Sequence, residues 1–432
     1  MKTYSKILDY LRGNPKLREE ILKKYAIIKN LTNSNGKLNS QERVYMPNQM
    51  TLGVELEIVG PASSYLYDIS INGFSGDCDN TIQDEKYPGI EITSPILEGN
   101  NIDDALAVAE QLTMLGEYTN KSCGGHIHIG ANYLEVRDDF QKVNEEATKF
   151  TWKSLLEMWK SNEKIMYKIT NRAGEEHRGI EFAKPIAPKI EEMLAYDDTP
   201  MNAYDYKKMI KKVQAEKEPY ESERFFSINF TNLNEGKNTL EFRLANGTIE
   251  PSELKANIEL FIAFVDISKR IGIVRYKEKN KSKLTKNEEE LLEKYKEICV
   301  EGNMSEEEQK DKLLEMMFDS DKSRIYNERY EKSTFNLEEE KQKLERESKA
   351  TSNEYGAQLS DEEMQKLKEY KRNNGIKEEV EFDMDDLEEL TAEIPEERVK
   401  TFINYWINQI RRWRHNRRVE ESQKPNEDDI ER

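Results

Sequence analysis

Two glutamates that lie two residues apart give the first indication of chemistry in this sequence. Glu55 and Glu57 belong to the segment 52–59, in which apolar residues alternate with other residues, as in a strand with one buried face. Both carboxylates then project from the same face, with their Cα atoms roughly 7 Å apart. Their charges repel by about 2–3 kcal/mol at an effective dielectric near 20. Since the segment contains no cationic residue, either the carboxylates face water or a positive group, such as a hard divalent cation, lies between them.

Four further segments show the same alternation and place polar residues at the alternate positions. The segments 226–231 and 240–244 are joined by a turn that contains Asn234 and Gly236, so we expect them to form an antiparallel hairpin. Together the five segments predict an antiparallel sheet with one polar face. That face carries Glu55, Glu57, Glu91, His126, His128, Ser227, Asn229, Thr231, Glu241 and Arg243.

An ordinary sheet with one water-exposed face would alternate in the same way. Two features favour a functional site instead. The predicted face concentrates glutamates, histidines and an arginine, and it holds two of the chain's four histidines. Those histidines directly follow Cys123, Gly124 and Gly125, and glycines allow a ligand or another segment to approach the backbone closely.

The composition of this face favours a metal and a phosphate. Carboxylates combined with imidazole suit magnesium, manganese or zinc, and the excess of carboxylates favours Mg²⁺, with Mn²⁺ as the alternative. These ions also bind substrate phosphates. Arg243, two residues after Glu241, suits a phosphoryl oxygen or a carboxylate. Such a set is suited to nucleotide-driven phosphoryl transfer. The sequence has no Gly-rich phosphate-binding loop, so a nucleotide would bind on the sheet itself.

The pair His126 and His128 also suggests a cupin-like metal oxygenase. A cupin would place a glutamate three or four residues after the second histidine. Ala131 and Asn132 occupy those positions, which disfavours this interpretation.

Five motifs, taken in order, resemble the amidoligase family, the carboxylate–amine ligases of the glutamine synthetase and glutamate–cysteine ligase type. The resemblance covers about residues 50–270, and possession of several motifs in the right order is more specific than any one motif. The motifs are Gly53-Val54-Glu55-Leu56-Glu57, Asp79-Asn80-Thr81-Ile82, Gly89-Ile90-Glu91-Ile92-Thr93-Ser94-Pro95, Ser122-Cys123-Gly124-Gly125-His126-Ile127-His128-Ile129-Gly130 and Thr239-Leu240-Glu241-Phe242-Arg243-Leu244-Ala245-Asn246-Gly247-Thr248.

The resemblance implies an α+β fold in which the concave polar face of an antiparallel sheet, backed by helices as in glutamine synthetase, binds magnesium and ATP. A substrate carboxylate would be activated as an acyl phosphate, and an amine would attack it to give an amide. Arg243 would hold the phosphoryl group or the substrate carboxylate, while His128 and Asn229 would line the nucleotide or substrate site. Asn80 and Thr81 stand where Gly and Ser are more typical, which weakens any role for Asp79. The implied metal ligands are Glu55, Glu57, Glu91, His126 and Glu241.

Basic residues between the predicted long helix and the hairpin either clamp phosphates or carry surface charge. Arg224 is favoured among them, because it adjoins a strand of the polar face; we expect it to act in catalysis together with Glu241 and Arg243. Arg172 is expected to help bind the nucleotide. Arg178 and Lys184 are further candidates. Arg324 and Arg329 either complete a substrate pocket or form ion pairs along a helix.

Apolar periodicity predicts helices over 3–30, 102–115, 140–170, 254–271, 277–295 and 304–330. We expect a helical segment and linker at 1–50, a catalytic domain at 51–335, and a charged extension at 336–432, helical or partly disordered. Within the extension, 399–419 combines aromatic residues with arginines. We expect this stretch either to contact nucleic acid or, as we favour, to dock onto the acidic body of the protein. The extension as a whole could also bind a protein partner.

Overall composition excludes several classes of protein. With 432 residues and a net charge of −19, the chain is unsuited to bind nucleic acid as a whole. The three cysteines form no metal pattern and suggest a reducing compartment. The sequence shows neither a signal-peptide core nor an apolar run of about 18 residues. We therefore expect a cytoplasmic protein without membrane segments.

The favoured function is an ATP- and Mg²⁺-dependent ligase that joins small-molecule or peptide carboxylates to amines. In one alternative, the protein has the same fold but no catalytic activity, and it serves as a binding or structural protein. Another is a metal-dependent hydrolase of an amide or a phosphate, which would need an activated water but no ATP.

Overall fold

The computed structural model describes residues 15–31, 44, 46–67, 69–71, 73–79, 81–171, 178–196, 201–215, 224–234, 236–344 and 346. The statements below concern these residues. Arg172, Asn80 and the predicted segments 1–14 and 347–432, including 399–419, lie outside them.

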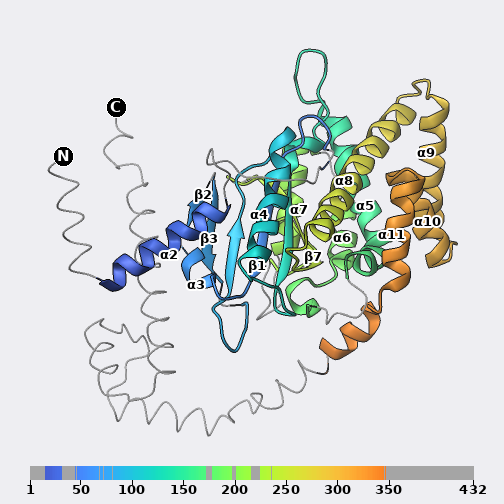
Figure 1. The fold of residues 1–432 in the computed structure, drawn as a ribbon. Helices are drawn as coiled ribbons and strands as arrows, with labels where there is room; N and C mark the ends of the chain where they lie inside the picture. The colour runs from blue at the N-terminus through green and yellow to red at the C-terminus, as the bar shows by residue number, and fades with distance from the viewer. Residues whose placement is uncertain are drawn as a thin grey trace, which may run out of the picture. The chain divides into compact units, whose positions relative to one another are not determined.

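A seven-stranded antiparallel sheet lies at the centre of the fold, with strand order β2-β3-β4-β1-β5-β7-β6 (Figure 1). The strand that carries Glu55 and Glu57 is the middle one, and the predicted hairpin is present as the pair of the last two strands. The strands are β1 (Leu52–Ile58), β2 (Ser70–Ile71), β3 (Phe74–Cys78), β4 (Ile90–Thr93), β5 (Gly124–Gly130), β6 (Ile228–Asn229) and β7 (Thr239–Asn246).

Helices pack around this sheet, which confirms the α+β class. The two longest, α5 and α8, pack against each other and the sheet: Trp159 of α5 contacts both Phe242 of β7 and Phe264 of α8, with ring centroids 5.4 and 5.2 Å away. The helices are α2 (Pro15–Leu31), α3 (Ser63–Leu66), α4 (Asp103–Met114), α5 (Glu145–Thr170), α6 (Ala187–Leu194), α7 (Ala203–Ala215), α8 (Pro251–Lys279), α9 (Lys286–Lys296), α10 (Glu306–Met317) and α11 (Ser320–Lys332). None of these helices is long and apolar enough to cross a membrane.

The sheet's apolar face fixes which residues reach the other face. Val54, Leu56, Ile127 and Phe242 are almost fully buried, and each contributes about 1.5–3 kcal/mol through burial. Because side chains alternate along a strand, the residues between them point to the opposite side. Strand register then aligns these polar residues in cross-strand pairs, namely Glu57 with Glu91, Glu55 with His126, His128 with Glu241, and Asn229 with Glu241.

Several predicted helices have different bounds in the structure: α5 begins at Glu145 instead of 140, α8 extends to Lys279, and the two helices predicted over 277–330 differ most. The predicted helix 304–330 is wrong as a single element, because the chain is extended at Phe318 and Asp319 then accepts a hydrogen bond from the Lys322 amide as the N-cap of α11. The helix predicted to start at 277 begins only at α9, where Thr285 and Glu288 form a capping box. Residues 277–279 belong instead to the end of α8.

The ends of the described chain are attached to the body. On the N-terminal side, Ile27 of α2 is buried and Lys23 donates to the hydroxyl of Tyr65 at 3.0 Å. On the C-terminal side, Phe335 is only 3% exposed and stacks on Tyr167 of α5, with ring centroids 5.2 Å apart. Leu337 is also buried, so the predicted boundary at 335/336 falls between two residues of the core.

Candidate functional site

The polar face of the sheet is buried. Glu57 and Glu241 are each 1% exposed and His126 is 2% exposed, so a water-exposed face is excluded. A buried carboxylate without a partner costs several kcal/mol. The acidic cluster must therefore be balanced by protein groups or by a bound cation.

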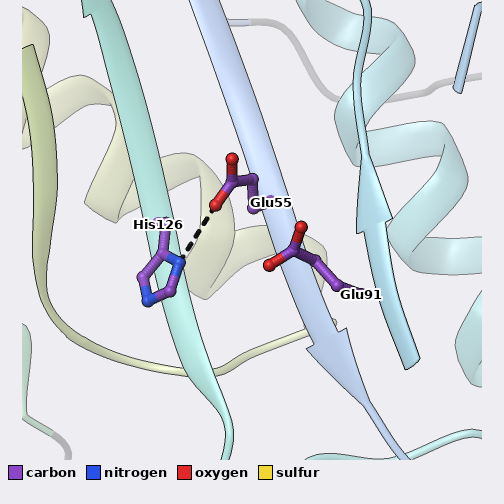
Figure 2. Close-up of side chains that lie close together, drawn as sticks. All are labelled: Glu55, Glu91 and His126. Atoms are coloured by element: carbon purple, nitrogen blue, oxygen red, sulfur yellow. Dashed lines mark hydrogen bonds and ion pairs between the residues drawn. The ribbon is translucent and has the colours of Figure 1, made fainter. Parts of the chain in front are cut away.

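His126 lies at the centre of the cluster, in β5. Its Nδ1 is 3.2 Å from Oε2 of Glu55 and its Nε2 is 3.4 Å from Oε1 of Glu57. Glu91, on β4 at the far side of β1, directs its carboxylate toward the same space (Figure 2). Strands β1 and β4 thus bring the carboxylates of Glu55, Glu57 and Glu91 around the imidazole that β5 carries.

His128 meets Glu55 from the other side. Its buried Nε2 lies 3.0 Å from Oε1 of Glu55. Its Nδ1 is 3.2 Å from the hydroxyl of Thr239. A proton on Nε2 suits the contact with the Glu55 carboxylate, whereas a metal bound at Nε2 would require the tautomer that is protonated at Nδ1, beside Thr239. Lys237 also approaches Glu55, at 3.5 Å, from a side chain that is 62% exposed.

Strand β7 contributes an acid–base pair. The guanidinium of Arg243 forms an ion pair with Oε1 of Glu241, while Asn229 and Asn232 donate to the other carboxylate oxygen at 2.7 and 3.2 Å. Burial alone would raise the pKa of Glu241. The charge of Arg243, with smaller effects from both histidines of β5, lowers this pKa to about 2. Glu241 is therefore an anion at any physiological pH.

Glu91 and Glu55 have pKa values shifted in opposite directions. Burial, followed by the negative charges of Glu55, Glu57 and Asp79, raises the pKa of Glu91 to about 8. Burial also acts to raise the pKa of Glu55, but its contacts with His126 and His128 hold this pKa well below its usual range. Glu91 is thus the member of the cluster that lacks a cation. A divalent ion would displace its proton, as metal binding to a protonated ligand does.

Three groups of side chains on this face have ligand atoms that lie within 4.8 Å of one another. Glu55 and Glu91 each belong to two groups, so the groups overlap. Hard carboxylate oxygens with one imidazole suit Mg²⁺ or Mn²⁺. The groups are Glu55, Glu91 and His126; Glu55, His128 and Glu241; and Glu57, Asp79 and Glu91.

Arg178, which the sequence analysis named as a further candidate behind Arg224, is a central member of the site. Its guanidinium lies 2.8 Å from Nε2 of His126 and 3.4 Å from Oε2 of Glu57. It fits there because residue 124 is glycine: a Cβ at that position would lie 1.6 Å from Nη1 of Arg178. The glycines before His126 did indicate a close approach, but the approaching residue is 52 positions away in sequence.

The other predicted site residues have varied positions. Arg224 is exposed and is not among the residues that the structure gathers at this face. Ser227 turns toward α5, where its hydroxyl donates to Glu163. Arg324 is 70% exposed and pairs with Glu328 along α11. Arg329 donates to the carbonyl of Ile169 and pairs with Glu253, which ties α11 to α5 and α8.

One cavity adjoins the acidic face, and a second lies near its other end. The first, of about 210 Å³, is lined by Glu55 and His128 together with Gly53, Pro95 and Lys237. The second, of about 290 Å³, is lined by Thr81, Ser122 and residues 179–182, and also by Glu340, Lys343 and Leu344. The first cavity lies at the end of the face that holds Glu55 and His128. The second lies at the Asp79 end, because Thr81 hydrogen-bonds to Asp79 and residue 179 follows Arg178.

Residues 61–265 match the model of a family described as "Putative amidoligase enzyme". This match confirms the amidoligase resemblance over that segment and supports a ligase-type enzyme. The segment contains Arg178 and the site residues of β4 to β7, whereas Glu55, Glu57 and residues 335–344 lie outside it. No curated protein matches the chain.

Proposed function

We propose that this protein is an ATP- and Mg²⁺-dependent carboxylate–amine ligase that forms an amide through an acyl phosphate. The observation that supports this most strongly is the set of three overlapping acidic groups on one sheet face, largely buried, with Arg178 and Arg243 beside them. The proposal includes a glutamine synthetase-like arrangement of the sheet.

The charges of the face support a divalent cation. The carboxylates of Glu55, Glu57, Glu91 and Glu241 outnumber the two buried arginines, and Asp79 adds a fifth carboxylate at the edge. The raised pKa of Glu91 reflects this excess. Mg²⁺ would supply positive charge between phosphate oxygens and an attacking carboxylate. Its ligands would come from the three groups, which adds His128 and Asp79 to the set implied by the family.

The arginines have a separate role in this proposal. A guanidinium can hold two phosphoryl oxygens at once, and it keeps its charge at every physiological pH. Arg243, in β7, and Arg178, opposite it, would hold the phosphoryl group while it moves from nucleotide to substrate. Asn229 and Asn232 keep the carboxylate of Glu241 in place.

The proposed reaction has two steps. A carboxylate oxygen of the first substrate attacks the γ-phosphorus of ATP, and the bond to the bridging oxygen breaks, so that ADP leaves. The amine nitrogen of the second substrate then attacks the activated carbonyl carbon, inorganic phosphate leaves, and the nitrogen loses a proton. Asp79 would accept this proton, because it is hydrogen-bonded by Thr81, which lines the second cavity. Two separate cavities, one lined by Glu55 and His128 and the other by Thr81 next to Asp79, suit a reaction that must bring two reactants together.

Calorimetric titration of ATP into the full chain, with Mg²⁺ and with EDTA, tests the proposal. We expect binding only with Mg²⁺, weakened at least tenfold in Glu57→Gln and unchanged in Glu98→Gln, since Glu98 is exposed and outside the site. Absence of ATP binding in both conditions would contradict the ligase. Hydrolysis of an amide or phosphate ester by the metal-loaded protein without ATP would favour the hydrolase instead.

A further inference from the structure

The second cavity has a wall that comes from outside the family-matched segment. Thr81, Lys121, Ser122 and residues 179–182 belong to the matched segment. Glu340, Lys343 and Leu344 belong to a helix at 337–344, the short orange helix after α11 in Figure 1. The cavity is therefore completed by the part of the chain expected from sequence to be a solvated extension.

This wall is held against the body by buried contacts. Phe335 stacks on Tyr167 and Leu337 is buried beside it. The hydroxyl of Tyr167 donates in turn to the carbonyl of Ala183, in the segment that carries Arg178 and the opposite wall of the cavity. One aromatic pair thus links both walls, so the position of the 337–344 helix is tied to that of the Arg178 segment.

The cavity is lined by side chains of both charges. Lys121 and Lys343 line it together with Glu181 and Glu340, and Lys343 is 3.9 Å from Glu340 of the same helix. Thr81, also in the lining, donates from both its amide and its hydroxyl to Asp79, at 2.7 and 2.8 Å, so the carboxylate of Asp79 lies directly behind this part of the wall. A ligand that fills the space would meet both lysines and carboxylates.

We propose that this cavity binds the amine substrate, and that this substrate is a zwitterion with a carboxylate at Lys121 and Lys343 and an amino group toward Asp79. Residues 335–344 are then part of the substrate site. A polyamine does not fit this arrangement, because it would bring a second cation to the two lysines. The role of the ligand as a substrate rests on the proposed ligase function, whereas its binding needs no ATP.

The test is ligand binding to the full chain without nucleotide, by saturation-transfer NMR followed by calorimetry. The probes are the free amino acids, simple dipeptides, putrescine and spermidine. We expect one or more amino acids or dipeptides to bind, at least tenfold more weakly in Lys343→Glu. Lys341→Glu is the matched control and should stay within twofold, because Lys341 is on the same helix, pairs with Glu338 and does not line the cavity.

Several outcomes would overturn the inference: no binding of any amino acid or dipeptide, tighter binding of a polyamine, or equal effects of the two charge reversals. Titration of ATP with Mg²⁺ into the same variants separates this inference from the proposed function. If amino acids bind in a way that depends on Lys343 but ATP does not bind, the proposed ligase function is refuted and the proposed amino acid site stands. ATP binding without a Lys343 effect would refute the site alone.

Discussion

Arg178 donates a hydrogen bond to Nε2 of His126 across 2.8 Å. A guanidinium has no acceptor, so Nε2 carries no proton and the neutral ring is protonated at Nδ1, which faces Glu55. Burial, and next the charge of Arg243, lower the pKa of His126, which agrees with a neutral ring. Nδ1 is also the ring nitrogen that faces Glu55 and Glu91 (Figure 2), so a metal bound by these three residues requires Nδ1 to lose its proton, and Arg178 opposes a shift of that proton to Nε2.

Replacement of Arg178 should separate metal binding from ATP binding. In Arg178→Ala, we expect Mn²⁺ to bind at least as tightly as in the wild type, because a competing cation is gone. ATP binding with Mg²⁺ should weaken at least tenfold, because a phosphoryl ligand is lost. Mn²⁺ titration followed by electron paramagnetic resonance, and calorimetry with ATP, measure the two effects.

Arg137→Gln serves as the control for Arg178→Ala, since Arg137 is exposed and pairs with Glu135. The same ATP assay on Arg224→Gln decides whether the role expected for Arg224 from sequence holds. Equal losses of Mn²⁺ and ATP binding in Arg178→Ala would indicate that the arginine only supports the fold.

Gly124→Ala should reproduce the loss caused by removal of Arg178. The added methyl would lie 1.6 Å from Nη1 of Arg178, so the guanidinium must leave its place. We expect at least a tenfold loss of ATP binding in Gly124→Ala. In the Arg178→Ala background, the same change should cost much less, since only the milder contact with Nε2 of His126, at 2.8 Å, remains. A double-mutant cycle measures this coupling, and additive effects would contradict the arrangement described here.

Glu91 should make the metal-free protein less stable as pH rises. Its pKa is about 8 in the folded chain and near the ordinary 4.5 when unfolded, so above pH 4.5 the unfolded chain releases a proton that the folded chain retains. The free energy of unfolding then falls between about pH 4.5 and 8. In EDTA, Glu91→Gln should be more stable than the wild type at pH 8, by about 4 kcal/mol. Urea denaturation at pH 5 and pH 8 checks this.

The exposed Glu98→Gln is the control for that experiment and should follow the wild type. Mg²⁺ at saturating concentration should remove much of the wild-type pH dependence, because the ion takes the place of the proton on Glu91. A stability difference between wild type and Glu91→Gln that stays constant with pH would show that Glu91 ionises normally.

Sequence periodicity predicted the strands of the site well, because burial of one face forces alternation. Glu55, Glu91, His126, Asn229 and Glu241 were all assigned to one polar face, and the structure places them together. Alternation gives the face of a residue but not its neighbours across strands. The overlap of the acidic groups at Glu55 and Glu91 follows from the register, which depends on long-range pairing.

Two features could not be read from local sequence. Burial of the polar face depends on what covers it, and the covering segment with Arg178 joins the site only through tertiary contacts. The preference for Arg224 relied on closeness in sequence to a strand, whereas closeness in space decides which arginine reaches the carboxylates. The end of α10 was missed for another reason: Phe318 continues the apolar pattern, while the cap at Asp319 ends the helix.

The sharing of Glu55 and Glu91 among the acidic groups has a consequence for how ions would fill the face. An ion at Glu55, Glu91 and His126 would use ligands that belong to both neighbouring groups. Each binding event would then change the affinity of the next by fixing a bridging carboxylate and by placing a second positive charge nearby. Metal titration of this protein should therefore give stepwise saturation, with an order set by the bridges, in place of independent isotherms.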